Sequence, residues 1–515
     1  MNSVLKLYKT SVFGGRKFPE EGIIVGYTAL IENYNLSIPY PEIITLISLK
    51  NKKYKTSSFN IYSKSYEPEN KLDKQIVFAL KYEGINLLFF KKLFEKLKEE
   101  QLIEIIQKEP SSIYSRKIWF LYEWLMEKKI AIHDADVKIK YIELVDTKIQ
   151  YALQKGVKSA RHRIINNLPG NIDFCPLIFK SDKIEKLIET NYSLQNITNL
   201  KPFHKDLLQR AAAFLLLQDS KASFTIEGEN PTNNRAMRWG KAIGQAGSKD
   251  LTIEELLRLQ QIVIENTRFL KMGLRKEGGF VGEHDRMTGE PLPEHISAKA
   301  QDIQKLLDGL LEAYNIMETD HFHPVLTAAS IAFGFVFIHP FTDGNGRVHR
   351  YIVHHILDKM NFTQQGFIFP ISASILNQIV DYRKVLESYS HSILDFIEWK
   401  KTNSNNVEVT NHTIDYYRYF DATKQVEFLF DCVKDTIENI IPNEIKYIQQ
   451  FDEMKRYLED IFEMPDSVVA LLIRFLEQNN GSLSKRAKEK EFIQLNEKEI
   501  QEIEENYKSI FLEVK

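Results

Sequence analysis

The sequence predicts a mainly α-helical protein with one short β-hairpin, and two observations support this. Apolar residues recur at helical spacing along most of the chain, as they do in amphipathic helices. Only one segment, in the middle third, changes to short extended structure. With 515 residues and a hydrophobic content of 43%, the chain is expected to form two to four domains with buried cores.

Residues 1–198 are predicted to form a mostly helical domain. Residues 113–125 carry a cluster of aromatic side chains, which core packing explains better than base stacking. A basic run at 155–163 has the composition of a nucleic-acid contact, but a Pro-Gly turn follows it. We therefore favour a solvated, disordered or acid-paired loop there. The apolar residues that recur at helical spacing in this domain are Phe90, Leu93, Phe94 and Leu97.

Residues 199–400 are predicted to form the central domain. An amphipathic helix covers about 207–228, and a second helix begins at Thr252, whose spacing to Glu255 is that of a capping box. Residues 325–338 are apolar on almost every face, which predicts a helix buried on all sides. That helix delivers His339 to the interior of the domain.

A hairpin is expected between these helices. Residues 274–282 change to short extended structure, and 287–290 have the composition of a turn. The Pro-Leu-Pro sequence at 291–293 is expected to break the regular structure that follows.

Residues 407–515 are predicted to form a C-terminal helical domain that packs against the central one. The polar stretch at 401–406 is the best linker in the sequence. An apolar stripe of helical period runs over 426–441 and is expected to end at Pro442. Asn480 and Gly481 indicate a turn within the remaining helical segment.

Charge and cysteine content limit the functional classes. Lys plus Arg total 68 against 70 Asp plus Glu, so neither nucleic acid nor an anionic membrane is an expected partner. The two cysteines lie far apart, which suggests a reducing compartment rather than a disulfide framework. The first residues lack the apolar core of a signal peptide, and no apolar run is long enough to span a bilayer. These features predict a cytoplasmic protein.

The most informative segment is the run of twelve residues from His339 to Arg350, HPFTDGNGRVHR. Glycines at 344 and 346 let successive backbone N–H groups converge on an anion, and a helix beginning there would add its positive end. Asp343 is a hard oxygen ligand suited to Mg²⁺. Arg347 and Arg350 are three residues apart, so both can face one phosphate chain. These groups together suit an enzyme that acts on a nucleoside triphosphate.

The same twelve residues resemble the Fic (Fido) family motif H-x-F-x-[D/E]-G-N-G-R-x-x-R at all eight specified positions. The resemblance covers about residues 200–400 and implies a helical Fic core with a short β-hairpin flap. It also implies the activity of a protein adenylyltransferase, which transfers AMP from ATP to a Ser, Thr or Tyr hydroxyl of a target protein. Gly346 is present, whereas phosphate-transferring relatives lack the full glycine pattern, which favours nucleotidyl transfer.

The resemblance also implies a role for each motif residue. His339 would be the general base, and its ordinary pKa of about 6.5 suits that role. Asp343 would bind Mg²⁺, for which Mn²⁺ can substitute. The residues that would bind the nucleotide are Gly344, Asn345 and Gly346 as an anion hole, Arg347 at the β-phosphate and Arg350 at the γ-phosphate.

Three further segments resemble parts of the family outside this motif. Residues 277–290 resemble the flap that aligns the target, with Phe280, Val281 and Gly282 on its strand. Tyr382 lies in a segment that resembles one enclosing the adenine, although ordinary helix packing explains it equally well. Residues 223–228, SFTIEG, match the inhibitory pattern [S/T]-x-x-x-E-[G/N].

In this pattern Glu227 is expected to contact Arg350 bidentately and to take the place of the γ-phosphate, while Ser223 holds the helix in place. A helix C-terminus capped by Gly228 is the alternative interpretation.

Other functions of the same fold stay open at this stage. The working reaction can be removal of AMP or transfer of another nucleotide, and a nucleotide-sensing regulator or toxin-like component is an alternative of a different class. The intact His339 argues against the last. The expected partners are ATP and an unidentified target protein, and self-association of the chain stays open.

Overall fold

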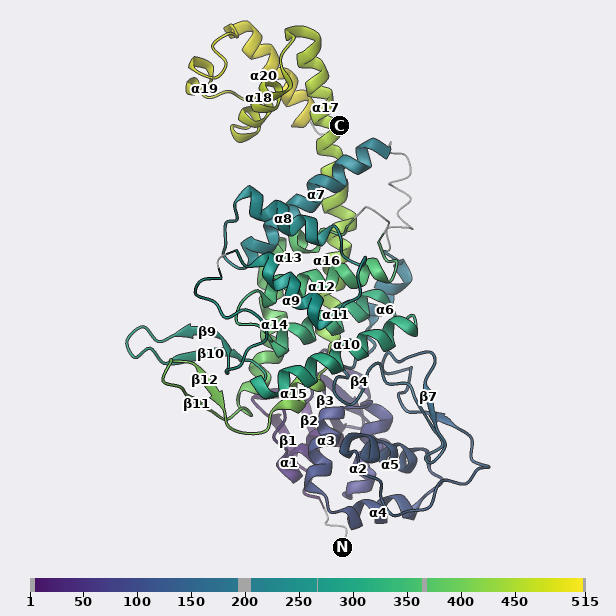
Figure 1. The fold of residues 1–515 in the computed structure, drawn as a ribbon. Coiled ribbons are helices and arrows are strands. Elements are labelled where there is room, and N and C mark those ends of the chain that lie inside the picture. The colour runs from purple at the N-terminus through teal and green to yellow at the C-terminus, as the bar shows by residue number, and fades with distance from the viewer. Residues whose placement is uncertain (1–4, 193–204, 266, 364–367, 513–515) are drawn as a thin grey trace.

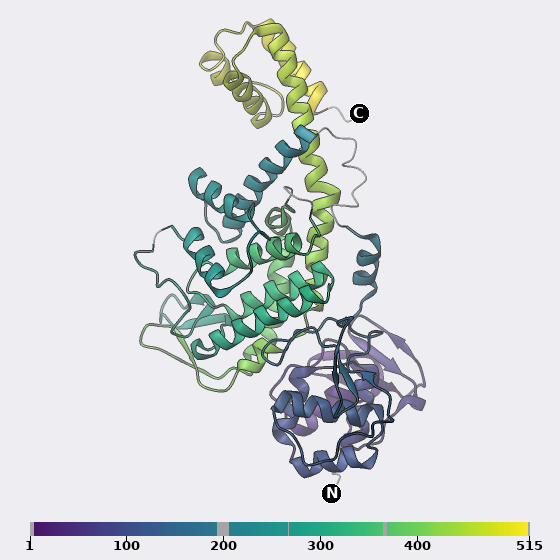
Figure 2. The same ribbon diagram turned by 45° about the vertical axis from the view of Figure 1, so that its right-hand side comes forward.

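The computed structural model describes residues 5–192, 205–265, 267–363 and 368–512. An N-terminal unit of helices and sheets lies at one end, a helical core in the middle, and a small helical bundle at the other end (Figure 1). The view turned by 45° shows the same order along the molecule (Figure 2). The predicted mainly α-helical class is confirmed. No helix in the described ranges is both long and apolar enough to cross a membrane.

The N-terminal unit contains a five-stranded sheet that the sequence analysis did not predict. Its strand order is β1-β2-β3-β5-β4, and only the β3–β5 pair is parallel. β3 is buried at every position, and a short apolar run of this kind cannot be told from a buried helix by periodicity. The strands are β1 (Lys9–Phe13), β2 (Arg16–Ile24), β3 (Ile44–Ser48), β4 (Tyr54–Lys55) and β5 (Phe59–Tyr62).

Helices of this unit pack beside the sheet, and the predicted aromatic cluster lies on α5. Trp119, Phe120 and Tyr122 are buried there, as expected for core residues. The helices are α1 (Gly26–Tyr34), α2 (Leu72–Tyr82), α3 (Leu87–Lys96), α4 (Glu99–Lys108) and α5 (Ile113–Met126). The next helix, α6 (Asp182–Thr190), packs instead against α16 (Thr423–Asp435) of the helical core (Figure 1).

Two members of the basic run at 155–163, Arg161 and His162, are paired with acidic residues. The Arg161 guanidinium contacts Glu123 at 2.9 Å and Asp134 at 2.5 Å, so its charge is neutralised within the unit. Part of the run lies in a three-stranded sheet made of β6 (Ile142–Glu143), β7 (Val157–Ser159) and β8 (Ile164–Asn166).

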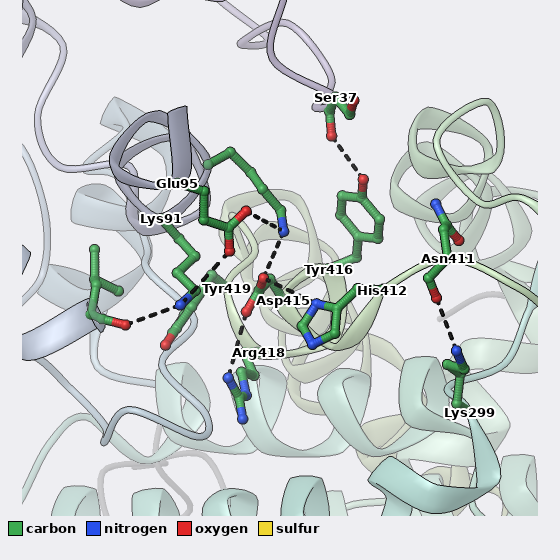
Figure 3. Close-up of polar contacts among 12 residues, drawn as sticks. Ser37, Lys91, Glu95, Lys299, Asn411, His412, Asp415, Tyr416, Arg418 and Tyr419 are labelled. Atoms are coloured by element: carbon green, nitrogen blue, oxygen red, sulfur yellow. Dashed lines mark hydrogen bonds and ion pairs between the residues drawn. The ribbon is translucent and has the colours of Figure 1, made fainter. Parts of the chain in front are cut away.

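Buried polar contacts join the N-terminal unit to the helical core (Figure 3). Asp415, on the short helix α15 (Ile414–Arg418), is fully buried. Its Oδ2 atom forms an ion pair with Nζ of Lys92 on α3 at 2.7 Å. The Tyr416 hydroxyl donates to the carbonyl of Ser37 at 2.8 Å. Because Lys92 and Ser37 belong to different elements of the N-terminal unit, α15 is held to that unit at two places.

The helical core surrounds α11, which is apolar on every face and buried over almost its whole length. Pro324 occupies the first turn, where its missing N–H has no intrahelical partner to lose. α11 spans Pro324–Ile338, and the other core helices are α7 (Lys205–Ile226), α8 (Asn233–Ile243), α9 (Ile253–Val263), α10 (Ile303–Thr319), α12 (Asn345–Lys359), α13 (Ile371–Asn377), α14 (Ile379–Leu394) and α16 (Thr423–Asp435).

The predicted hairpin is present as β9 (Phe280–His284) and β10 (Pro291–Ile296). The expected break at 291–293 is wrong, because these residues begin strand β10. A bulge between Pro293 and His295 shifts the register, and in a two-stranded sheet each strand has a free edge that tolerates proline.

A second hairpin replaces the predicted linker. The polar residues 402–406 form the turn between β11 (Trp399–Lys401) and β12 (Val407–Val409). Asn405 has a φ of +57°, a left-handed conformation that asparagine tolerates. The linker prediction is wrong, because a tight turn and a flexible linker have the same polar composition.

The helix expected to end at Pro442 continues past it. Residues Thr436–Ile440 form a π-helical turn after α16, and α17 (Ile441–Phe462) carries Pro442 in its first turn. Pro442 cannot donate to a carbonyl of the preceding turn, and the π-helical turn directly before it accommodates this loss while the chain stays helical.

The packing differs from the three predicted domains. Residues 407–448 share the hydrophobic core of the central helices, whereas a separate core forms from Met454 to Tyr507. The boundary at 198 lies outside the described residues, and the three-domain division stays a prediction. The small bundle consists of the end of α17 with α18 (Asp466–Gln478), α19 (Lys485–Glu489) and α20 (Glu497–Phe511).

Candidate active site

The candidate base, His339, lies directly after the last residue of α11. It has a left-handed backbone with a φ of +54°, and its N–H still donates to the Phe335 carbonyl at 3.0 Å. The buried helix therefore fixes the position of His339, which lines a cavity of about 600 Å³.

The surroundings of His339 keep the imidazole neutral. Burial, the neighbouring His295 and the Arg275 guanidinium lower the pKa of His339 to about 3. The Nδ1 atom lies 3.2 Å from the Val336 carbonyl, and a carbonyl can only accept a hydrogen bond. The Nδ1 atom must therefore carry the proton, and the Nε2 atom has a free lone pair, as a general base requires.

Arg275 is a functional residue that the sequence analysis did not identify. Its buried guanidinium donates to the carbonyls of His339 at 2.6 Å, Glu277 at 2.7 Å and Ala298 at 2.6 Å. The backbone N–H of Arg275 also donates to the Pro340 carbonyl at 2.9 Å. These partners lie in three separate segments, so no local sequence pattern could have revealed the arrangement.

Replacement of Arg275 by Lys should lower AMP transfer about 100-fold, because an ammonium cannot bridge three carbonyls and the base would shift. We expect ATP affinity to change little, since the phosphate arginines lie elsewhere. Transfer rates and calorimetric ATP binding would be compared with those of Arg474→Lys, a substitution at an exposed position of α18 in the small bundle. Equal loss of binding and transfer in Arg275→Lys would contradict a positioning role.

The loop after His339 is held rigid from within. Phe341 is fully buried. The Asn345 side chain accepts a hydrogen bond from the Phe341 N–H at 2.9 Å and donates one to the Phe341 carbonyl at 2.8 Å. Asn345 therefore contributes to the site by closing the loop.

The residues of the predicted anion site lie at the N-terminus of α12. Gly344 caps the helix with a φ of +96°, a conformation that residues with side chains rarely adopt. A Cβ atom on Gly346 would lie 2.2 Å from Oε1 of Glu227, so only glycine admits a carboxylate at this point. The free N–H groups and the positive helix end favour an anionic group there.

Arg350 is held by the predicted inhibitory segment at the end of α7. Its Nη1 atom lies 2.8 Å from Oε1 of Glu227. Nε donates to Ser223 Oγ at 3.1 Å, and Nη2 donates to the Ser223 carbonyl at 2.6 Å. The expected bidentate contact with Glu227 is wrong, because Ser223 takes the other two nitrogens. The arginine thereby also caps the C-terminus of α7.

α7 is anchored over α12 by a second buried contact. Asp219 of α7 is fully buried, lies 2.9 Å from His354 of α12, and accepts from the N–H of Ser372 at 2.6 Å. The segment that carries Glu227 is therefore fixed relative to the anion site.

Arg347 also has a carboxylate partner, which the sequence analysis did not identify. Its Nη1 atom lies 2.6 Å from Glu229, and its Nη2 atom donates to Asp343 at 3.0 Å. The pattern that identified Glu227 ends one residue before Glu229, so it gave no signal for this contact.

Asp343 has the properties of a single-carboxylate magnesium ligand. Its side chain is 45% exposed, and Oδ1 accepts from the Gly344 N–H and from Arg347. Over the described ranges no group of three acidic, histidine or cysteine side chains could hold a metal. A lone, half-exposed carboxylate beside an anion site fits Mg²⁺, which takes one or two carboxylates and completes its shell with phosphate oxygens and water.

The predicted flap borders the cavity beside His339. Phe280 lies in the cavity wall, together with the turn of the β11–β12 hairpin. Val281 is 43% exposed, and a Cβ atom on Gly282 would lie 2.2 Å from the Leu292 carbonyl. Gly282 therefore permits the close approach of β10 to β9.

Tyr382 does not line this cavity. It is only 4% exposed, and its ring packs with Phe333, His349 and Phe428 at centroid distances of 5.7 to 6.4 Å. The structure thus supports the helix-packing interpretation, and base stacking by Tyr382 would require it to leave this packing.

Comparisons with known proteins relate part of the chain to one family. Residues 250–357 match the model of the Fic/DOC family. The protein adenylyltransferase Fic of Nematostella vectensis is 26% identical over 115 residues, which are 22% of this chain and 25% of that relative. A Fido domain-containing protein of Dictyostelium discoideum is 35% identical over 104 residues, 20% of this chain and 62% of that protein.

The alignment with the solved structure of a Fic family protein from Desulfovibrio desulfuricans covers 64% of this chain and 86% of the other chain. The identity is 19% and the TM-score is 0.35. The chain spans about a quarter to a third of the adenylyltransferases that it matches. The family match at 250–357 contains the motif loop, all of α11 before it, and α12 after it as far as residue 357. The chain therefore contains a Fic/DOC (Fido) domain at residues 250–357.

Proposed function

We propose that this protein is an adenylyltransferase that moves AMP from ATP to a Ser, Thr or Tyr hydroxyl of a target protein. One observation carries the proposal: the neutral imidazole of His339 and the anion site of α12 are the two ends of one rigid loop. A base with a free Nε2 atom beside a phosphate-binding helix end suits attack of a hydroxyl on a phosphorus atom.

In the proposed reaction, Nε2 of His339 takes the proton of the target hydroxyl as its oxygen attacks the α-phosphorus. The new bond joins this oxygen to phosphorus, the bond from the α-phosphorus to the bridging oxygen breaks, and pyrophosphate leaves. Backbone N–H groups at Gly344 and Gly346 would stabilise the developing charge. Mg²⁺ held by Asp343 would neutralise the α- and β-phosphates.

Two further assignments belong to the proposal. Arg347 and Arg350 would bind the β- and γ-phosphates after their carboxylate partners withdraw. The target segment would add to the free edge of β9, which would hold its hydroxyl in the cavity beside His339.

The decisive experiment incubates the purified protein with labelled ATP, GTP, UTP and CTP, with and without cell lysate. Label from ATP on protein, lost in His339→Ala, is the expected result. Label from another nucleotide would show that ATP is not the donor. Release of AMP from modified protein without transfer would show that the working reaction is AMP removal. Binding without either reaction would favour a nucleotide-sensing regulator.

The metal assignment predicts that Asp343→Ala loses Mg²⁺-dependent turnover, because no second carboxylate in the loop can replace it. EDTA should do the same to the parent protein, and Mn²⁺ should restore activity. Asp343→Glu is the matched control, since the family motif accepts either acid. Full activity in EDTA would exclude this role.

A further inference from the structure

The end of α7 delivers two carboxylates to the phosphate site. Gly228 has a φ of +75°, which turns the chain after the helix, and the N–H groups of both Glu227 and Glu229 donate to the Phe224 carbonyl. This turn brings Glu229 back toward α12 on the same side as Glu227. The two acids therefore reach the two motif arginines from one short segment.

Glu229 lies between two arginines. One carboxylate oxygen is 2.6 Å from Arg347, and the other is 2.5 Å from Arg235 of α8. Both guanidinium groups lie over the ring of buried Phe224, at 5.4 Å and 4.6 Å from its centroid. Packing thus fixes Glu229 in place. The charge of Arg347, whose side chain is only 2% exposed, is compensated by Glu229 at 2.6 Å together with Asp343 at 3.0 Å.

With both glutamates in place, the positive and negative side-chain charges around the anion site are equal in number. The guanidinium groups of Arg235, Arg347 and Arg350 face the carboxylates of Glu227, Glu229 and Asp343. A triphosphate entering the site therefore meets little net positive charge. Removal of the Glu229 charge would leave Arg347 paired with Asp343, and removal of the Glu227 charge would take the carboxylate away from Arg350.

We propose that Glu229 sets the affinity of this site for the second phosphate of a nucleotide by holding Arg347. This role is separate from the one that the inhibitory pattern already implies for Glu227, which holds Arg350 at the third phosphate. The inference rests on the proposed function, because it takes these arginines as the ligands of the β- and γ-phosphates. The two acids would then act on successive phosphates rather than as one inhibitory group.

The test measures binding of AMP, ADP and ATP by calorimetry to the full-length protein and to two variants. Glu229→Gln should raise the affinity for ADP and ATP about tenfold and leave AMP within about twofold. Glu227→Gln should raise the affinity for ATP alone by a similar factor. Glu265→Gln is the matched control, because Glu265 lies 3.9 Å from Arg235 and has no contact with Arg347.

Each outcome decides between the assignments. Equal gains for all three nucleotides in Glu229→Gln, or no gain, would overturn the role of Glu229 alone. Failure of every variant and of the parent to bind any nucleotide would overturn the proposed function as well. If Glu229→Gln does not fold, Glu229→Asp is the alternative variant, because it withdraws the carboxylate by one methylene. This variant should give a smaller gain in affinity for ADP and ATP. The absence of any such gain would contradict the proposal.

Discussion

Replacing Glu227 with Gly should raise AMP transfer, including self-modification, by about one to several orders of magnitude. Glu227 lies where a phosphate group would approach Arg350 and the N-terminus of α12. With the carboxylate in place, ATP would bind with its terminal phosphate displaced and its α-phosphorus misaligned for attack. Misalignment by about 1 Å can cost about 100-fold in rate.

Folding should be nearly unchanged by this substitution. The Glu227 side chain is 34% exposed, and Arg350 keeps its two hydrogen bonds to Ser223. Because Glu229 would still hold Arg347, we expect the double variant lacking both carboxylates to transfer faster than Glu227→Gly. Thermal unfolding would verify that stability is preserved.

The measurement follows labelled AMP on protein, and separately the release of AMP from a purified modified substrate. Glu463→Gly is the matched control, since it also removes an exposed glutamate just after a helix, in the small bundle away from the site. If release stops while transfer is unchanged, the carboxylate orients water for AMP removal. If neither rate changes, Glu227 is not inhibitory.

His339→Ala should abolish transfer while ATP still binds. Loss of a general base costs about 10²–10⁴-fold, whereas the phosphate contacts come from the loop and the arginines. The effect should be measured in the Glu227→Gly background, where transfer is fast enough to show the full loss. His391→Ala, on the exposed face of α14, is the control. Near-normal transfer by His339→Ala would exclude the imidazole from the reaction.

The low pKa of His339 also predicts how the rate of AMP transfer depends on pH. A pKa lowered to about 3 keeps the imidazole neutral throughout the neutral range, so protonation of His339 should not limit transfer between about pH 5 and 8. The rate should fall only as the pH approaches the lowered pKa. A loss of activity centred near pH 6.5, absent from ATP binding, would show that the surroundings do not lower the pKa of His339.

Much of the helical core could be predicted from local patterns. The apolar run at 325–338 has one physical solution in water, a helix buried on all sides, and the structure contains it as α11. Thr252 caps α9 as its sequence spacing predicts. The sheet of the N-terminal unit and the turn at 402–406 were missed, because short apolar strands and polar turns have the same local composition as other structures.

The sequence alone determined which candidate groups the site contains, because the proposed base, the proposed metal-binding carboxylate, the glycines and the arginines lie within one loop and helix turn. Their partners come from distant segments and were decided only by tertiary packing. Arg275 holds the His339 backbone, Ser223 takes two nitrogens of Arg350, and Glu229 neutralises Arg347. Local spacing fixes which groups share a turn of helix, whereas the burial of α7 against α12 decides which charges meet across it.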